Sequence, residues 1–119
     1  MAERSKTITA IPTSPGYAWV VSWEGLLNGD TGAALEMSGW ADRSVQVIGT
    51  FDTSTLTVQG SNDGATWATL HDPQGSNLAF TSAGIKAVAE AVRYIRPSSA
   101  GGASTDLDVF ILISGPRII

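Results

Sequence analysis

The chain has 119 residues, which is the size of one domain. Hydrophobic residues make up 43% of it and charged residues only 15%, so we expect a folded chain with a largely uncharged surface. The net charge of −4 and the scatter of the seven basic residues argue against direct nucleic-acid binding, because phosphate recognition needs several basic side chains on one face. The absence of cysteine excludes disulfides, thiolate metal sites and cysteine nucleophiles.

Strand-like runs separated by Gly, Asn, Asp, Ser and Pro recur along the whole chain, as in a sandwich or barrel. In chain order the runs cover residues 7–11, 17–23, 44–51, 55–60, 66–70, 78–81, 92–96 and 107–114. Two further segments, 33–37 and 85–91, fit either a short strand or a helical turn. The sequence predicts a single all-β domain, a jelly-roll-like antiparallel β-sandwich of roughly eight to ten strands.

The two ends of the chain are expected to extend from this domain. Residues 1–6 are predicted to form a short N-terminal arm and residues 115–119 a C-terminal tail. No run reaches the roughly 20 apolar residues needed to span a bilayer, and no secretory segment follows Met1. We therefore expect synthesis in the cytoplasm and no membrane partner.

Three details of the strand pattern give structural predictions. Asn62-Asp63-Gly64 predicts a tight turn, because glycine adopts positive φ without a Cβ clash, and Val58 and Trp67 should then share a buried face. Pro97 should end the strand 92–96, because proline has no N–H to donate. The nearly continuous apolar run 107–114 predicts a central strand.

The sequence offers no catalytic machinery. The single histidine, His71, lies beside Asp72 in a predicted loop, and no G-x-S-x-G nucleophile motif occurs, so His71 is expected to cap a turn. Asp106 and Asp108 could form a glycosidase pair but fit a solvent-facing strand end better. One histidine without cysteine makes a zinc site improbable, and we expect no cofactor and no metal.

The four tryptophans are many for this length. Trp19, Val21 and Trp23 share one face of their strand by the period of two, and that face is predicted to be the core. Trp40 lies between Gly39 and Ala41 and is the better candidate for an interface, where tryptophan is enriched. Trp and Tyr rings exposed side by side would instead suit sugar binding.

One resemblance rests on a hairpin and a strand. The hairpin is Ser61-Asn62-Asp63-Gly64-Ala65-Thr66-Trp67, and the strand is Arg93-Tyr94-Ile95-Arg96. Both resemble scaffold positions of the discoidin-like (coagulation factor C-type) sandwiches, which bind sugars and lipids. This resemblance implies a fold and leaves the ligand open.

A second resemblance rests on the order of motifs from position 29 to 114. The motifs are Gly29-Asp30-Thr31-Gly32, Asp42-Arg43-Ser44-Val45-Gln46-Val47, the hairpin above, Asp72-Pro73-Gln74-Gly75, Phe80-Thr81-Ser82-Ala83-Gly84 and Arg93-Tyr94-Ile95-Arg96-Pro97. Their order is similar to that in the small head decoration (cement) proteins of tailed bacteriophages. The resemblance implies a jelly-roll-like sandwich that binds the capsid exterior, with the major capsid protein as partner and a homo-oligomer, dimer or trimer, as the assembled form.

The sequence thus favours a virion decoration protein located on the capsid exterior. The alternatives are a carbohydrate-binding discoidin-like module and another virion part, such as a tail or head-completion subunit, with an enzyme least supported. Since the C-terminal Ile118 and Ile119 gain little in solvent, we expect the ends to be held against the domain or a neighbour. The residues predicted to contact a partner are Arg4, Lys6, Trp40, Arg117, Ile118 and Ile119.

Overall fold

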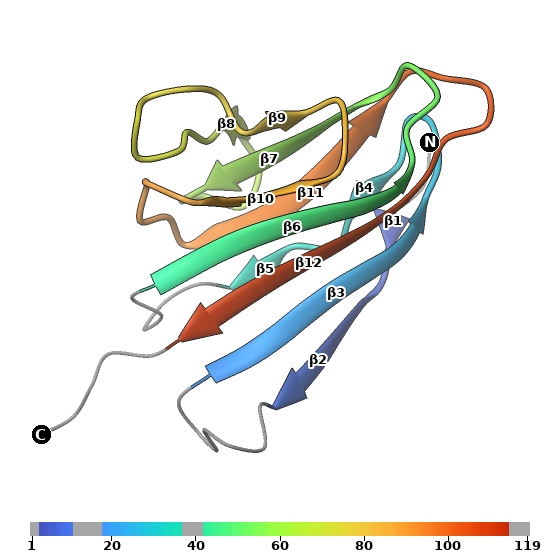
Figure 1. Cartoon of the computed structure of the whole chain (residues 1–119). Helices are drawn as coiled ribbons and strands as arrows, with labels where there is room; N and C mark the ends of the chain where they lie inside the picture. Colours follow the sequence, from blue (N-terminus) through green and yellow to red (C-terminus); the bar gives the residue numbers. More distant parts are fainter. Residues whose placement is uncertain (1–2, 11–17, 37–41, 115–119) are drawn as a thin grey trace, which may run out of the picture.

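The computed structural model describes residues 3–10, 18–36 and 42–114, and these form two β-sheets packed face to face (Figure 1). The all-β sandwich predicted from the sequence is confirmed. Within the described residues there are twelve strands, more than the eight to ten expected, because five of them are only two residues long. No described helix is long and apolar enough to cross a membrane.

The front sheet of Figure 1 has five strands, and all its neighbouring strands are antiparallel. Across the sheet they are β10 (Gly84–Ala87), β6 (Asp42–Thr50), β12 (Asp106–Ser114), β3 (Ala18–Leu26) and β2 (Lys6–Ala10). The apolar run at the end of the sequence is β12, in the middle of this sheet. The prediction of a central strand is confirmed.

The second sheet has seven strands, five of them very short. Its main path runs through β1 (Glu3–Arg4), β4 (Thr31–Gly32), β11 (Tyr94–Ala100), β7 (Thr55–Ser61) and β8 (Ala68–Thr69), while β5 (Leu35–Glu36) pairs with β11 and β9 (Ala79–Phe80) pairs with β7. The pairing of β1 with β4 is parallel, and the other pairings are antiparallel.

The chain changes sheet at most of its connections, which gives the sandwich its jelly-roll-like character. It passes from β2 and β3 in the five-stranded sheet to β4 and β5 in the other, and back to β6. It then alternates through β7–β9, β10, β11 and β12. Of the two segments that fitted a strand or a helical turn, 33–37 contains the short strand β5, and 85–91 overlaps the short strand β10, which begins one residue earlier.

The core lies between the sheets and is formed by the inward-facing residues of both. Trp23 and Val21 on β3 are fully buried, and Trp19 packs against the core, so the predicted inward face of this strand is confirmed. The indole Nε1 of Trp23 donates a hydrogen bond to the carbonyl of Ala33 at 2.9 Å, which satisfies its one polar atom.

The prediction that Pro97 ends its strand is wrong. β11 continues through Pro97 to Ala100, and Pro97 lies opposite Val58 on β7. The Val58 N–H donates to the Leu78 carbonyl, and the Val58 carbonyl accepts from the Leu70 N–H, both on the side away from β11. The pairing of Val58 with Pro97 therefore requires no N–H from the proline. The proline ring instead occupies the space beside Gly32 on β4, where a Cβ would lie 2.5 Å from the proline Cδ.

The prediction that Val58 and Trp67 share a buried face is also wrong. The turn is wider than expected, because Asp63 Oδ1 accepts hydrogen bonds from the backbone N–H groups of both Ala65 and Thr66 at 2.8 Å. The residue that lies beside Val58 after this turn is Leu70, whose N–H donates to the Val58 carbonyl and whose side chain is buried in the core. Trp67 lies on the outer side of the sheet.

The described part of the predicted N-terminal arm, residues 3–6, lies in the sandwich. Glu3 and Arg4 form β1 beside β4, and Lys6 begins β2 opposite Trp23. Since β1 belongs to the seven-stranded sheet and Lys6 to the five-stranded sheet, removing these residues would disrupt strand pairing in both. The predicted tail, residues 115–119, lies outside the described residues.

Candidate interaction surface

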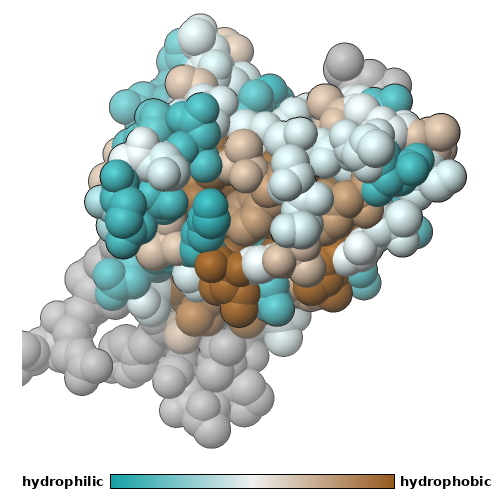
Figure 2. All heavy atoms as spheres, turned by 45° about the horizontal axis from the view of Figure 1, so that its top comes forward, coloured by the Kyte–Doolittle hydropathy of each residue, from teal (hydrophilic) through white to brown (hydrophobic). Residues whose placement is uncertain are grey.

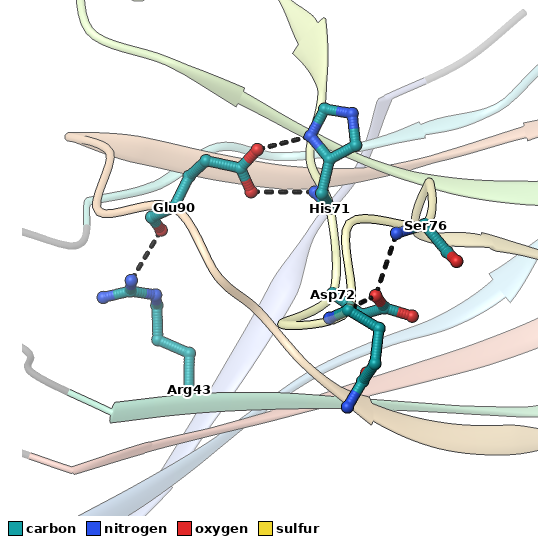
Figure 3. Close-up of polar contacts among 6 residues, drawn as sticks. Arg43, His71, Asp72, Ser76 and Glu90 are labelled. Carbon is teal, nitrogen blue, oxygen red and sulfur yellow. Dashed lines mark hydrogen bonds and ion pairs between the residues drawn. The ribbon is translucent and has the colours of Figure 1, made fainter.

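The polar cluster around His71 joins three segments of the chain (Figure 3). His71 Nδ1 lies 2.5 Å from Glu90 Oε2, and the His71 backbone N–H donates to Oε1 at 2.8 Å. Burial would raise the pKa of Glu90, but the hydrogen bonds from the His71 side chain and backbone outweigh it and lower that pKa. Arg43 Nη2 also donates to the Glu90 carbonyl. These hydrogen bonds hold the segment that follows β10 against His71 and against Arg43 of β6.

The turn that follows His71 is capped by Asp72 rather than by the histidine. Asp72 Oδ1 accepts hydrogen bonds from the N–H groups of Gln74 and Ser76 at 3.0 Å (Figure 3). The expectation that His71 itself caps a turn is therefore wrong. Among the described residues no group of three His, Asp or Glu side chains could hold a metal ion.

The other acidic residues singled out in the sequence stabilise turns and a bulge. Asp108 Oδ1 accepts from the backbone N–H of Gly25 at 3.0 Å, where the register of β12 and β3 shifts. Backbone N–H groups of Thr66 and Ala65, with the Ser61 hydroxyl, hold the pKa of Asp63 well below its ordinary value. Both carboxylates therefore stabilise the local backbone conformation of the fold.

The outer face of the five-stranded sheet carries an exposed apolar strip, formed by Val20, Ile85, Phe110 and Leu112. Leu112 lies opposite Val20 on β3 and Ser44 on β6, while Phe110 and Ile85 both lie opposite Gln46. Ile85 is 65% exposed and Leu112 42% exposed. Figure 2 shows hydrophobic surface gathered in one region, with hydrophilic residues around it.

The apolar strip is slightly hollowed. A shallow groove of about 330 Å³ runs over it, and its lining adds only the uncharged Ser44 and Gln46. Large apolar side chains gathered in this way on a folded domain are typical of sites that contact another molecule. The apolar strip is therefore the candidate contact surface.

The outer face of the seven-stranded sheet is polar, and we call it the hydroxyl face. Thr57 lies opposite Ser98 on β11, and Gln59 lies opposite Thr69 on β8. The Arg96 guanidinium stacks 4.1 Å from the centre of the Trp67 ring, and its Nε donates to Gln59 Oε1 at 2.9 Å. Burial lowers the pKa of Arg96 and the charge of Glu3 opposes this shift.

A third feature is a groove of about 450 Å³ between the sheets at one end of the sandwich. Ile8, Trp19, Leu35 and Ile113 give it an apolar wall, with Lys6 among its polar lining. Several of these residues adjoin segments outside the described part of the chain. Lys6, one of the predicted contact residues, lines this groove and not the apolar strip.

Of the six predicted contact residues, the structure describes Arg4 and Lys6. Arg4 is paired within the domain, its Nε lying 2.7 Å from Asp30 Oδ2. Trp40, Arg117, Ile118 and Ile119 lie outside the described residues, and their contact role stays a prediction.

Sequence reasoning missed the apolar strip, although one signal for it was present. Phe110 and Leu112 interrupt the polar positions expected on the outer side of β12, which gives the run 107–114 its continuous apolar character. Such a run indicates a strand that is apolar on both faces. It does not indicate that one of those faces is left exposed by the described residues.

No protein-family model and no curated protein matches this sequence. Among solved structures, the chain is similar to the SPBc2 prophage-derived protein YomS, with a TM-score of 0.63 at 6% identity, over 84% of this chain and 96% of that one. The two proteins share a fold. The chain is also matched to the CBM32 of AlyQ in complex with 4,5-unsaturated mannuronic acid, over 91% of this chain and 74% of that one at 11% identity, but the TM-score of 0.38 is too low to support an argument.

Proposed function

We propose that this chain is a structural protein of a phage virion, a decoration protein that binds the outside of the capsid and stabilises the shell. The observation that carries the proposal is the apolar strip on the outer face of the five-stranded sheet, with Ile85 and Leu112 substantially exposed. The phage origin of YomS, which has the same fold, supports the setting. In this proposal the partner is the major capsid protein and the location is the capsid exterior.

The physics of shell stabilisation suits a small sandwich of this kind. Each attached copy favours the closed shell by its own binding free energy, and a shell offers many equivalent positions. A contact of standard size buries roughly 800 Å² on each partner. An uncharged apolar centre on the outer face of a sheet can contribute the core of such a contact, while a dimer or trimer of the chain would hold several capsid subunits at once.

The test is co-sedimentation of the purified protein with expanded capsids that lack it. We expect saturable binding at a fixed copy number and a higher melting temperature of the decorated capsids. Absence of capsid binding at every protein concentration would contradict the proposal. A virion protein of another kind, such as a tail or head-completion subunit, would bind tails or portal complexes in the same assay.

Carbohydrate recognition is the second candidate, and the hydroxyl face favours it. Trp67 lies on the outside of the sheet with the Arg96 guanidinium and the Gln59 amide beside it, and aromatic rings with polar neighbours suit sugars. A glycan array run on the same preparation tests this reading. Reproducible glycan binding that Trp67→Ala abolishes, together with no capsid binding, would replace the first proposal by the second.

A further inference from the structure

The charges around the apolar strip have one sign. Strand register places Asp42, Asp106 and Asp108 on the outer side of the five-stranded sheet, opposite Ser114, Thr50 and Ile48 respectively. Glu24 follows the inward-facing Trp23 and is exposed, which adds a fourth carboxylate to this face. We call these four residues the acidic rim.

The basic residues of the same strands point elsewhere. Lys6 lies opposite the buried Trp23, and Lys86 lies opposite the buried Val45. Arg43 lies opposite the buried Ile113. By register, the outer face of the described strands therefore presents carboxylates and no Lys or Arg.

The acidic rim bounds the apolar strip at both ends along the strands. On β12, Asp106 and Asp108 precede Phe110 and Leu112, while at the other end Asp42 lies two residues before Ser44, the neighbour of Leu112. An interface usually has an apolar centre and a polar border. Here that border is acidic.

We infer that the apolar strip binds a protein surface whose apolar side chains are bordered by Lys and Arg. The inference rests on the proposed function, because it names the chemistry of the capsid surface that this face would contact. Complementary charge at the border speeds association and excludes wrong partners. Attachment through this face is therefore weakened by salt, since exposed charges are screened within roughly 10 Å at 0.1 M ionic strength.

The same charges disfavour two other occupants. A second copy of the chain, stacked on this face, would bring two acidic rims together, and like charges that meet across an interface weaken it. Nucleic acid would place phosphates against the same carboxylates. Any homo-oligomer of the chain then uses a different surface.

The first test uses peptides and needs no capsid. An alternating Leu-Lys peptide and an alternating Leu-Glu peptide are titrated into the isotope-labelled protein, and amide resonances are followed by NMR. We expect the Leu-Lys peptide to shift resonances of β3, β6 and β12, and the Leu-Glu peptide to leave them unchanged. Equal shifts with both peptides, or no shift with either, would overturn the inference.

The second test uses capsids and a matched pair of double variants. Glu24→Lys with Asp106→Lys reverses two rim charges, whereas Glu3→Lys with Glu36→Lys makes the same change in net charge at outward positions of the other sheet, opposite Thr31 and Tyr94. We expect the first pair to weaken capsid attachment by roughly tenfold and the second to leave it within about twofold. Raising the salt from about 50 mM to about 500 mM should weaken the wild-type protein comparably.

The two tests separate the inference from the proposed function. Capsid attachment that ignores salt and the rim variants would overturn the inference and leave the decoration role standing. A wild-type protein that never binds capsids would overturn the decoration role, while the peptide titration would still decide the chemistry of this face.

Discussion

The two outer faces of the sandwich are built on the same strand alternation and carry opposite kinds of side chain. On the five-stranded sheet, Phe110 and Leu112 of β12 point outward among uncharged neighbours. On the seven-stranded sheet, Thr57, Gln59 and Ser98 occupy the corresponding outward positions. The hydroxyl face is polar, as most of a protein surface in water can be, whereas the apolar strip is typical of a surface that contacts another molecule.

The two faces also contribute to different properties of the protein. Side chains on the hydroxyl face contact one another, as the stacking of Arg96 on Trp67 shows, and so contribute to folding. The most exposed residue of the apolar strip, Ile85, leaves most of its surface to solvent. Burial of Ile85 against a partner would therefore contribute free energy to binding rather than to folding. Substitutions on the two faces should separate attachment from stability.

The largest expected effect is on capsid attachment. Ile85→Ser with Leu112→Ser removes the two most exposed side chains of the apolar strip. The double variant should weaken attachment by about a hundredfold or more, because burying each side chain contributes roughly 1.5–3 kcal/mol. Thr57→Ala with Thr69→Ala is the control on the hydroxyl face and should leave attachment unchanged. Co-sedimentation with capsids measures both. Equal losses for the two pairs would mean that the faces do not differ in binding.

The next largest effect is on the free energy of unfolding, and it depends on how closely the two sheets pack around a glycine. A Cβ on Gly32 of β4 would lie 2.6 Å from Trp23 Cδ1, whereas one on Gly84 of β10 would meet Phe80 at an ordinary 3.8 Å. Gly32→Ala should lower the free energy of unfolding by about 2–3 kcal/mol, and Gly84→Ala should change it by less than about 0.5 kcal/mol. Urea denaturation tests the pair, and a tolerated Gly32→Ala would contradict the placement of Pro97.

A smaller effect concerns the stacked pair on the hydroxyl face. Trp67→Ala removes the ring beneath the Arg96 guanidinium and should lower the free energy of unfolding by about 1 kcal/mol, as expected of a partly exposed cation–π contact. Trp67→Phe keeps an aromatic ring and should recover part of the loss. Attachment to capsids should be the same for both variants. Weaker attachment of Trp67→Ala would place the contact on the hydroxyl face.

The smallest expected effect is a pH-dependent change in the free energy of unfolding, caused by the Glu90–His71 contact near the edge strand β10. The folded state lowers the pKa of Glu90 below its ordinary 4.5, so the Glu90–His71 contact stabilises the fold above that pH and the contribution is lost as the pH falls through the lowered pKa. Glu90→Gln should lower the free energy of unfolding at neutral pH by less than about 1 kcal/mol, because the pair is partly exposed. The difference from wild type should vanish in acid. Urea denaturation across this pH range is the measurement, with Glu24→Gln as the control.

Alternation and turn residues were sufficient to predict the sandwich and its central strand. The inward set of β3, with Val21 and Trp23, follows from a period of two, and β12 is recognised by its apolar run. These features depend only on residues close together in the sequence.

The features that sequence reasoning missed depend on distant partners. Pro97 continues its strand because Gly32, far away in the sequence, leaves room for the proline ring. Trp67 faces outward because the Asp63 side chain widens the turn before it. Arg4 is paired with Asp30, 26 residues away in the sequence. None of these can be found from local pattern.

The central claim is that the outer face of the five-stranded sheet meets the capsid, and oxidative footprinting of side chains tests it most directly. Hydroxyl radicals label exposed aromatic and aliphatic side chains, and the protein is labelled free and capsid-bound. We expect Ile85, Phe110 and Leu112 to lose labelling on the capsid while Trp67 keeps it. Protection of Trp67 with unchanged labelling of Ile85 and Leu112 would contradict the claim.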